Sequence, residues 1–281
     1  MHPNLPDRLF PTARDEAAVA NKPTSVPQTE HPAYELAFQD KDFLLTDEMR
    51  PVRLQLEMAK CDLALAAAGI KSMFVFYGSA RIPAPEDAQA LIDAAKTDAE
   101  RAVATRLAAN AKYYDIARSL ARLVSGEGED QRWFTVCSGG GPSIMEAANR
   151  GAADVGAPSV GLNIVLPFEQ VPNPYVTPGL SFQFHYFALR KMHFLMRARA
   201  VAVFPGGFGT LDEFMELLTL VQTGKISPLP ILLYGREFWG RIVNFEALAD
   251  EGVIARGDLD LFHTVDTAEE GWAIVRKHYE I

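Results

Sequence analysis

One stretch constrains this chain more than any other: an apolar run that passes through a glycine-rich turn into an amphipathic segment. The stretch is Val201-Ala-Val-Phe-Pro-Gly-Gly-Phe-Gly-Thr-Leu-Asp-Glu213. Its first four residues are short, apolar and partly β-branched, which is typical of a buried strand. Apolar residues then recur at helical spacing, at Leu211, Phe214, Leu217, Leu218 and Val221. The pattern therefore predicts a strand, a tight turn and a helix.

The turn itself has the features of an anion site. Gly206, Gly207 and Gly209 permit backbone angles and close approaches that a Cβ forbids, and Thr210 is a candidate N-cap for the helix. Free N–H groups and the positive end of the helix dipole point to the same place. A plain tight turn has similar glycines, but the added Thr210 and the acidic pair Asp212-Glu213 favour phosphate binding. We expect that acidic pair in the first helical turn, facing the ligand.

Two further strand–glycine–helix junctions precede this one. An apolar run over 72–77 leads into Gly78-Ser-Ala-Arg81, and another over 133–137 leads into Ser138-Gly-Gly-Gly-Pro-Ser-Ile-Met-Glu146. Each junction alone is a weak signal, since small residues also form ordinary turns. In parallel sheets the carboxyl ends of the strands meet at one edge, so the three loops are predicted to converge. The candidate ligand-binding residues on the first two loops are Gly78, Ser79, Gly140, Gly141 and Glu146.

The order of the remaining segments predicts an α/β fold. Residues 1–46 are rich in proline and lack periodicity, which indicates an extended or partly disordered N-terminal arm. Residues 47–281 are predicted to form one Rossmann-like domain, a mainly parallel sheet flanked by helices. Further strands are expected at 158–163, 181–185, 230–234 and 261–265. Helices are expected at 51–68, 84–124 (two helices or one kinked helix), 186–198, 237–251 and 268–278.

Composition excludes several functions. The net charge of −9 argues against binding to nucleic acid or to anionic membrane surfaces. No apolar run approaches 18 residues, so no transmembrane helix is expected, and the N-terminus lacks the pattern of a secretory signal. Cys61 and Cys137 have no metal-site spacing. These features favour a cytoplasmic protein with free thiols and no bound metal.

The motifs together resemble those of the LONELY GUY family, whose members are often misannotated as lysine decarboxylases. The resemblance spans about residues 70–270, and its extra loop over 162–180 is similar to the longer bacterial branch. Two positions depart from the family pattern: Ser143 stands where that branch usually has glycine, and Asp212 where many members have glutamate. The matching motifs are Gly78-Ser-Ala-Arg81, Gly139-Gly-Gly-Pro-Ser-Ile-Met-Glu-Ala-Ala-Asn-Arg-Gly151, Phe184-His-Tyr-Phe-Ala-Leu-Arg-Lys191 and Pro205-Gly-Gly-Phe-Gly-Thr-Leu-Asp-Glu213.

The resemblance implies an N-glycosidase that hydrolyses nucleoside 5′-monophosphates, such as AMP or cytokinin-type N6-modified AMP, to free base and ribose 5-phosphate. It implies phosphate binding at the third glycine loop, Arg190 and Glu213 as the catalytic pair, and Lys191 beside them. It also implies a homodimer or higher homo-oligomer and no cofactor. The reaction passes through an oxocarbenium-like ribose, which a carboxylate stabilises. The helix dipole and Arg190 are expected to keep Glu213 ionised.

Three other functions fit these residues less well. A noncatalytic nucleotide or molybdenum-cofactor carrier on the same fold has no need for an acid beside the ribose, so Glu213 argues against it. A nicotinamide-dependent oxidoreductase is disfavoured because Ser138-Gly-Gly-Gly-Pro-Ser does not match Gly-x-Gly-x-x-Gly. A lysine decarboxylase needs a Schiff-base lysine, and no lysine here has that setting. The sequence does not determine which base is preferred.

Overall fold

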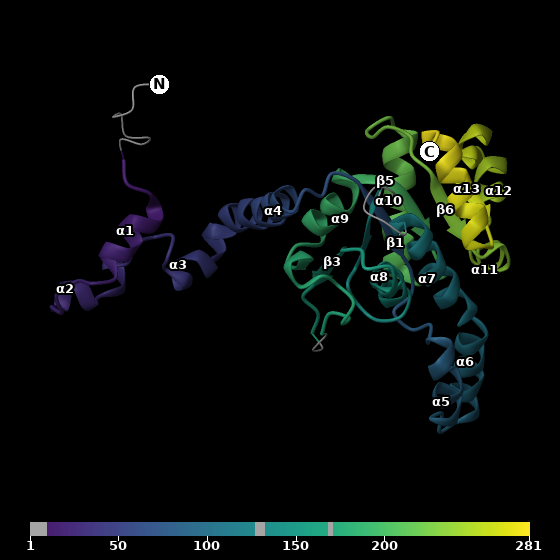
Figure 1. Ribbon diagram of the computed structural model, residues 1–281, viewed down its shortest axis with the longest axis horizontal. Helices are drawn as coiled ribbons and strands as arrows, with labels where there is room; N and C mark the ends of the chain where they lie inside the picture. The colour runs from purple at the N-terminus through teal and green to yellow at the C-terminus, as the bar shows by residue number, and fades with distance from the viewer. Residues whose placement is uncertain (1–9, 127–132, 168–170) are drawn as a thin grey trace. The chain divides into compact units, whose positions relative to one another are not determined.

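A computed structural model describes residues 10–126, 133–167 and 171–281 (Figure 1). By contacts, the chain divides into two compact units, Met1–Glu57 and Met58–Ile281. The described part of the first unit holds short helices with no buried residue: α1 (Ala13–Ala20), α2 (Pro27–Glu30), η1 (Pro32–Tyr34), α3 (Lys41–Leu45) and η2 (Asp47–Met49). Helix α4 (Arg50–Ala67) spans the division. The sequence-based boundary, an arm over 1–46 and a domain over 47–281, stays a prediction.

The second unit is built on a seven-stranded sheet in the order β4-β3-β2-β1-β5-β6-β7. Every pair of neighbouring strands is parallel. The central strand aligns Val75 with Cys137 on one side and with Val201 on the other. The predicted Rossmann-like parallel sheet is thus confirmed. Its strands are β1 (Met73–Tyr77), β2 (Thr135–Ser138), β3 (Ser159–Ile164), β4 (Ser181–Phe184), β5 (Ala198–Val203), β6 (Ile231–Tyr234) and β7 (His263–Val265).

Helices cover both faces of this sheet, so the strands are apolar on both sides. Alternate residues of β1 enter different cores: Phe74 and Phe76 pack on one face, and Met73, Val75 and Tyr77 on the other. The first core includes residues of α7 (Lys112–Ser125), α8 (Ile144–Asp154) and α13 (Ala268–Tyr279). The second includes residues of α4, α9 (Phe187–Met196), α10 (Phe208–Gln222) and α11 (Arg236–Ile242).

The helical segments expected over 84–124 and 237–251 are divided into more elements than predicted. The 84–124 segment contains η3 (Pro85–Asp87), α5 (Ala88–Asp93), α6 (Asp98–Ala109) and α7, because Thr97 starts α6 with a capping box formed with Glu100. The 237–251 segment is α11 followed by α12 (Phe245–Asp250), whose N-cap Asn244 accepts from the Ala247 backbone. Besides η3, the described part of the unit contains the short 3-10 helices η5 (Pro178–Leu180) and η6 (Arg256–Leu261).

In the part of the chain that the structure describes, no helix is both long enough and apolar enough to cross a bilayer.

Candidate active site

The three glycine junctions follow β1, β2 and β5, which are adjacent in the sheet. Their loops are linked by backbone hydrogen bonds: the Ser79 N–H donates to the Pro205 carbonyl at 3.0 Å, and the Ile144 N–H donates to the Ser79 carbonyl at 3.3 Å. The predicted convergence at the carboxyl edge of the sheet is therefore correct. Gly78, Gly140 and Gly207 lie on one edge because all three strands run in the same direction.

Close packing requires glycine at several positions in these loops, among them Gly206 and Gly140. A Cβ on Gly206 would lie 2.1 Å from Thr210 Oγ1, far inside van der Waals contact. At Gly140 the backbone is left-handed, with φ of +71°, and a Cβ would lie 2.5 Å from Asn163 Oδ1. The loops are thus fixed in shape by the residues that face them.

The third loop differs from its prediction in where the helix starts. Helix α10 begins at Phe208 with Gly207 as N-cap, so Thr210 is not the cap; it is buried within the first turn. The extended backbone of Gly207, with φ of −100° and ψ of −150°, starts the helix before Thr210 is reached. Asp212-Glu213 accordingly falls in the second turn. The first N–H groups of α10, beginning at Phe208, have no intrahelical acceptor and remain suited to an anion.

Arg190 and Glu213 form a buried ion pair between α9 and α10. Arg190 Nη1 lies 3.0 Å from Glu213 Oε1, and the two side chains are only 10% and 13% exposed. Arg190 Nε also donates to the Leu162 carbonyl at 2.6 Å, and its guanidinium lies 4.9 Å from the centre of the Phe194 ring. The guanidinium is therefore held from three directions, and it presents a fixed charge to the carboxylate.

This pair lies against the second glycine loop. A Cβ on Gly139 would lie 2.6 Å from Arg190 Nη2 and 2.7 Å from Met145 Sδ. The absent side chain at Gly139 is what allows the guanidinium to reach the end of β2. The ion pair and the glycine loops thus form one continuous site.

The ionisation of Glu213 differs from the sequence-based expectation. Burial raises the pKa of the Glu213 carboxyl to about 7; the Arg190 charge opposes this shift and the Asp212 charge adds to it. The cost of desolvating the carboxylate outweighs the attraction of the guanidinium. Arg190 therefore does not keep Glu213 fully ionised near neutral pH, as the motif alone had suggested.

This pKa predicts a pH-dependent stability difference between the wild type and Glu213→Gln. The folded chain holds the Glu213 proton up to pH about 7, whereas a glutamate ordinarily loses it near 4.5. The stability contributed by the protonated form is thus complete below pH 4.5 and is lost as the pH rises to about 7. As the pH rises through this window, we expect the unfolding free energy of the wild type to fall by up to about 3 kcal/mol relative to that of the variant.

Urea unfolding at pH 4.5, 6 and 8 checks this expectation. The other titrating groups are common to both proteins, so their contributions cancel when the two unfolding free energies are subtracted. The readout is how this difference in unfolding free energy changes with pH. A difference in unfolding free energy that does not change with pH would contradict the raised pKa of Glu213.

Lys191 has two acidic partners. Its Nζ lies 3.1 Å from Asp212 Oδ1 and 3.1 Å from Glu216 Oε2, and its side chain is 19% exposed. These carboxylates come one and two turns into α10, beyond the helix N-terminus. The predicted role of Lys191 in substrate binding stays a prediction.

Glu146 contacts α7. Its Oε1 accepts from the Tyr114 hydroxyl at 2.8 Å, and Arg150 Nη1 lies 3.3 Å from the same hydroxyl. Glu146 thus joins α8 to α7 in this structure, and its predicted contact with a ligand is untested.

Sequence reasoning assigned no role to Asn173, which holds the second glycine loop in place. Its backbone N–H donates to the Gly140 carbonyl at 2.9 Å. Its buried side chain donates to the Gly141 carbonyl at 3.0 Å and to Asn149 Oδ1 at 2.9 Å. The sequence feature that could have pointed to this role is an asparagine between two prolines, in a loop that the sequence already predicts to be ordered.

Ser143, one of the two departures from the family pattern, has a strained backbone. Its φ of +66° and ψ of −126° lie in a region that favours glycine, and its Oγ donates to the Ile82 carbonyl. We expect Ser143→Ala to be less stable than Ser143→Gly by about 1 kcal/mol, because only glycine relieves the strain. Both variants lose the hydroxyl bond, so the comparison isolates the backbone. Chemical denaturation measures it, and an alanine variant as stable as the glycine variant would refute it.

Among the residues that the structure describes, no set of three or more His, Cys, Asp or Glu is placed to hold a metal ion. The candidate site therefore consists of the buried Arg190–Glu213 ion pair and the backbone N–H groups at the start of α10.

Comparison with known families agrees with the motifs. Residues 145–275 match the family model described as "Possible lysine decarboxylase". This match supports the resemblance to the LONELY GUY family that the motifs indicated, and it covers just under half of the chain. A comparison with curated proteins found no match.

Similar folds occur among solved structures. One is the X-ray structure of TM1055, 22% identical, with 73% of this chain and 99% of that chain covered and a TM-score of 0.47. Two others are structures of the molybdenum cofactor carrier protein of Chlamydomonas reinhardtii. They are 16% and 15% identical, cover 74% and 75% of this chain and 96% and 100% of theirs, and have TM-scores of 0.44 and 0.42. Similarities at this level do not define a function.

Proposed function

We propose that this protein hydrolyses the N-glycosidic bond of a nucleoside 5′-monophosphate, AMP or an N6-modified AMP, to give free base and ribose 5-phosphate. The observation that carries the proposal is the buried Arg190–Glu213 pair, 3.0 Å apart, packed against the glycine loops at the carboxyl edge of the sheet. A carboxylate held in a low-dielectric site beside anion-binding N–H groups suits a reaction that generates positive charge on a phosphorylated sugar.

In this proposal the third glycine loop binds the 5′-phosphate. Gly206, Gly207, Gly209 and Thr210 surround the start of α10, where backbone N–H groups and the helix dipole favour a dianion. The phosphate is remote from the bond that breaks, so its binding energy positions the ribose and lowers the entropic part of the barrier. Gly78, Ser79, Gly140 and Gly141 would contact the rest of the substrate; they lie on the first and second glycine loops, and the first of these loops is hydrogen-bonded to both of the others.

Glu213 would act at the ribose. Its ionised form stabilises the oxocarbenium-like transition state, and it orients or deprotonates the attacking water. A pKa of about 7 suits a group that exchanges a proton near neutral pH. Arg190 would support the carboxylate and contact the substrate, with no cofactor required.

We also propose a cytoplasmic homodimer or higher homo-oligomer. Phe187 and Phe208 begin α9 and α10 beside the site and are 55% and 92% exposed. Large apolar side chains at this degree of exposure favour a contact with another copy of the chain.

The test is incubation with a panel of nucleoside 5′-monophosphates, with chromatographic detection of free base and of ribose 5-phosphate in equal amounts. Cleavage of AMP or an N6-modified AMP supports the proposal and identifies the base. Tight binding without cleavage of any member would instead favour the noncatalytic carrier.

A further inference from the structure

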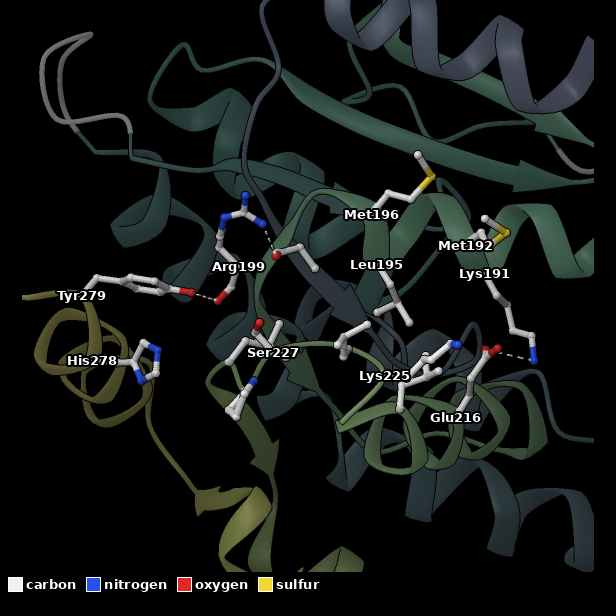
Figure 2. Close-up of a pocket in the computed structure, with 15 residues that line it drawn as sticks. Lys191, Met192, Leu195, Met196, Arg199, Glu216, Lys225, Ser227, His278 and Tyr279 are labelled. Carbon is white, nitrogen blue, oxygen red and sulfur yellow. Dashed lines mark hydrogen bonds and ion pairs between the residues drawn. The ribbon is translucent and has the colours of Figure 1, made fainter. Parts of the chain in front are cut away.

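A second cavity lies at the edge of the sheet opposite the glycine loops. Its volume is about 760 Å³, within the range of small-molecule sites. It is lined by Ala198 at the start of β5 and by the 225–229 loop, which leads into β6, and these mark the amino ends of the two strands. Helices α9, α10 and α13 provide the remaining walls (Figure 2).

One wall of this cavity is apolar and contains two methionines. Helix α9 presents Met192, Leu195 and Met196, and Ile226 and Leu229 come from the loop before β6. Met192 and Met196 are 49% and 41% exposed, although both are large apolar side chains. Unbranched methionines adapt their shape to apolar ligands. Exposed apolar surface in a concave setting indicates that something of similar character binds there.

The rim carries an excess of positive charge. Lys191, Arg199 and Lys225 line the cavity, whereas Glu216 is its one acidic lining residue. The local formal charge is thus three minus one, or +2, in a chain whose net charge is −9. Cationic side chains around an apolar cavity favour the binding of an anionic ligand there, although the net charge of the protein is negative.

Lys225 is the best-placed cation for such a ligand. Lys191 is already paired with Asp212 and Glu216, and Arg199 Nη1 donates to the Ala198 carbonyl at 2.9 Å. Lys225 is exposed, and no carboxylate of the described ranges 10–126, 133–167 and 171–281 forms an ion pair with it. Ser227 and His278 line the cavity as well and add hydrogen-bonding groups (Figure 2).

We propose that this cavity is a second small-molecule site, which binds an amphipathic organic anion. The carboxylate or sulfonate of the ligand pairs with Lys225, and its apolar body packs against Met192, Leu195 and Met196. A nucleotide does not fit this description, because its charge is a phosphate dianion and its sugar is polar. The site is therefore separate from the one proposed for the nucleotide, and binding there does not depend on hydrolysis.

The test uses 8-anilinonaphthalene-1-sulfonate as a fluorescent probe of the full chain. We expect saturable binding to one site per chain, displacement by decanoate, and displacement by decanol at least about 10-fold weaker, because the alcohol lacks the charge. Lys225→Glu is expected to weaken both probe and decanoate on the order of 10-fold or more. Ile226→Trp, which fills the cavity and keeps the charge, is expected to lower probe affinity to a similar degree.

Lys277→Glu is the matched control. It makes the same charge change on α13, next to His278, but Lys277 does not line the cavity. Retention of wild-type probe affinity by Lys225→Glu, or equal displacement by decanol and decanoate, would overturn the proposal. It would also be overturned if Lys225→Glu changed only the oligomeric state, measured by light scattering, since the cavity would then be a contact between copies. None of these readouts measures nucleotide hydrolysis, so the two proposals can fail separately.

Discussion

Replacing Glu213 by glutamine is expected to lower the turnover of AMP on the order of 10²-fold or more, while AMP affinity stays within a few fold of wild type. Glutamine keeps the size of the side chain and an oxygen that can accept from Arg190, which lies 3.0 Å from the carboxylate. It removes the negative charge that the oxocarbenium-like transition state requires. Initial rates give the turnover, and calorimetric titration with AMP gives the affinity.

Asp212→Asn serves as the control for this substitution. Asp212 is the preceding carboxylate on α10, but its side chain is 56% exposed and its partner is Lys191. We expect its loss to change turnover by no more than a few fold, since exposed ion pairs contribute little. If Glu213→Gln instead hydrolysed AMP at the wild-type rate, Glu213 would be only a structural residue of α10, and the carrier function would become the better account.

A single added methyl at Gly206 is expected to have an effect of similar size. The Cβ of Gly206→Ala would meet Thr210 Oγ1 at 2.1 Å and Thr210 Cβ at 2.6 Å, and Thr210 is itself buried. Either the loop or the first turn of α10 must move, which costs about 1–3 kcal/mol of stability. Because the phosphate-binding N–H groups belong to this turn, a shift of about 1 Å is expected to lower kcat/KM for AMP on the order of 10²-fold.

Gly207→Ala separates the clash from the mere presence of alanine in the loop. A Cβ at Gly207 has no atom within 4 Å among the described residues, and its backbone does not require positive φ. Gly207→Ala should therefore unfold at the same denaturant concentration as the wild type. Gly206→Ala should unfold at a clearly lower denaturant concentration. Equal stability of Gly206→Ala and wild type would contradict the packing described here.

The strand–glycine–helix pattern predicted the sheet and the convergence of the loops, because strand direction alone determines where loops meet. It could not predict where helices are interrupted. Thr97 and Asn244 end up as N-caps through side-chain hydrogen bonds to the backbone, which leave the apolar periodicity unchanged. The same limit applied to Thr210, which had the residue type of a cap but lies inside the helix.

The candidate pair was also found from its motif, whereas its electrostatics were not. The resemblance to the LONELY GUY family implied that Arg190 and Glu213 act as a pair, and a guanidinium beside a carboxylate ordinarily favours the charged form. The pKa depends instead on how completely the folded chain excludes water from Glu213, which only the packed structure determines. Asn173 was missed for a related reason, since its bonds to the Gly140 and Gly141 carbonyls join segments about 30 positions apart.

The most direct measurement for the proposed function is the rate of base release from AMP and from adenosine at equal concentration with the same enzyme preparation. The two substrates share the base, the ribose and the bond that breaks, and differ only in the 5′-phosphate. If the N-terminus of α10 and the glycine loop bind that phosphate, AMP is cleaved to adenine and ribose 5-phosphate, and adenosine is cleaved at least about 10²-fold more slowly. Equal rates on AMP and adenosine would contradict the account.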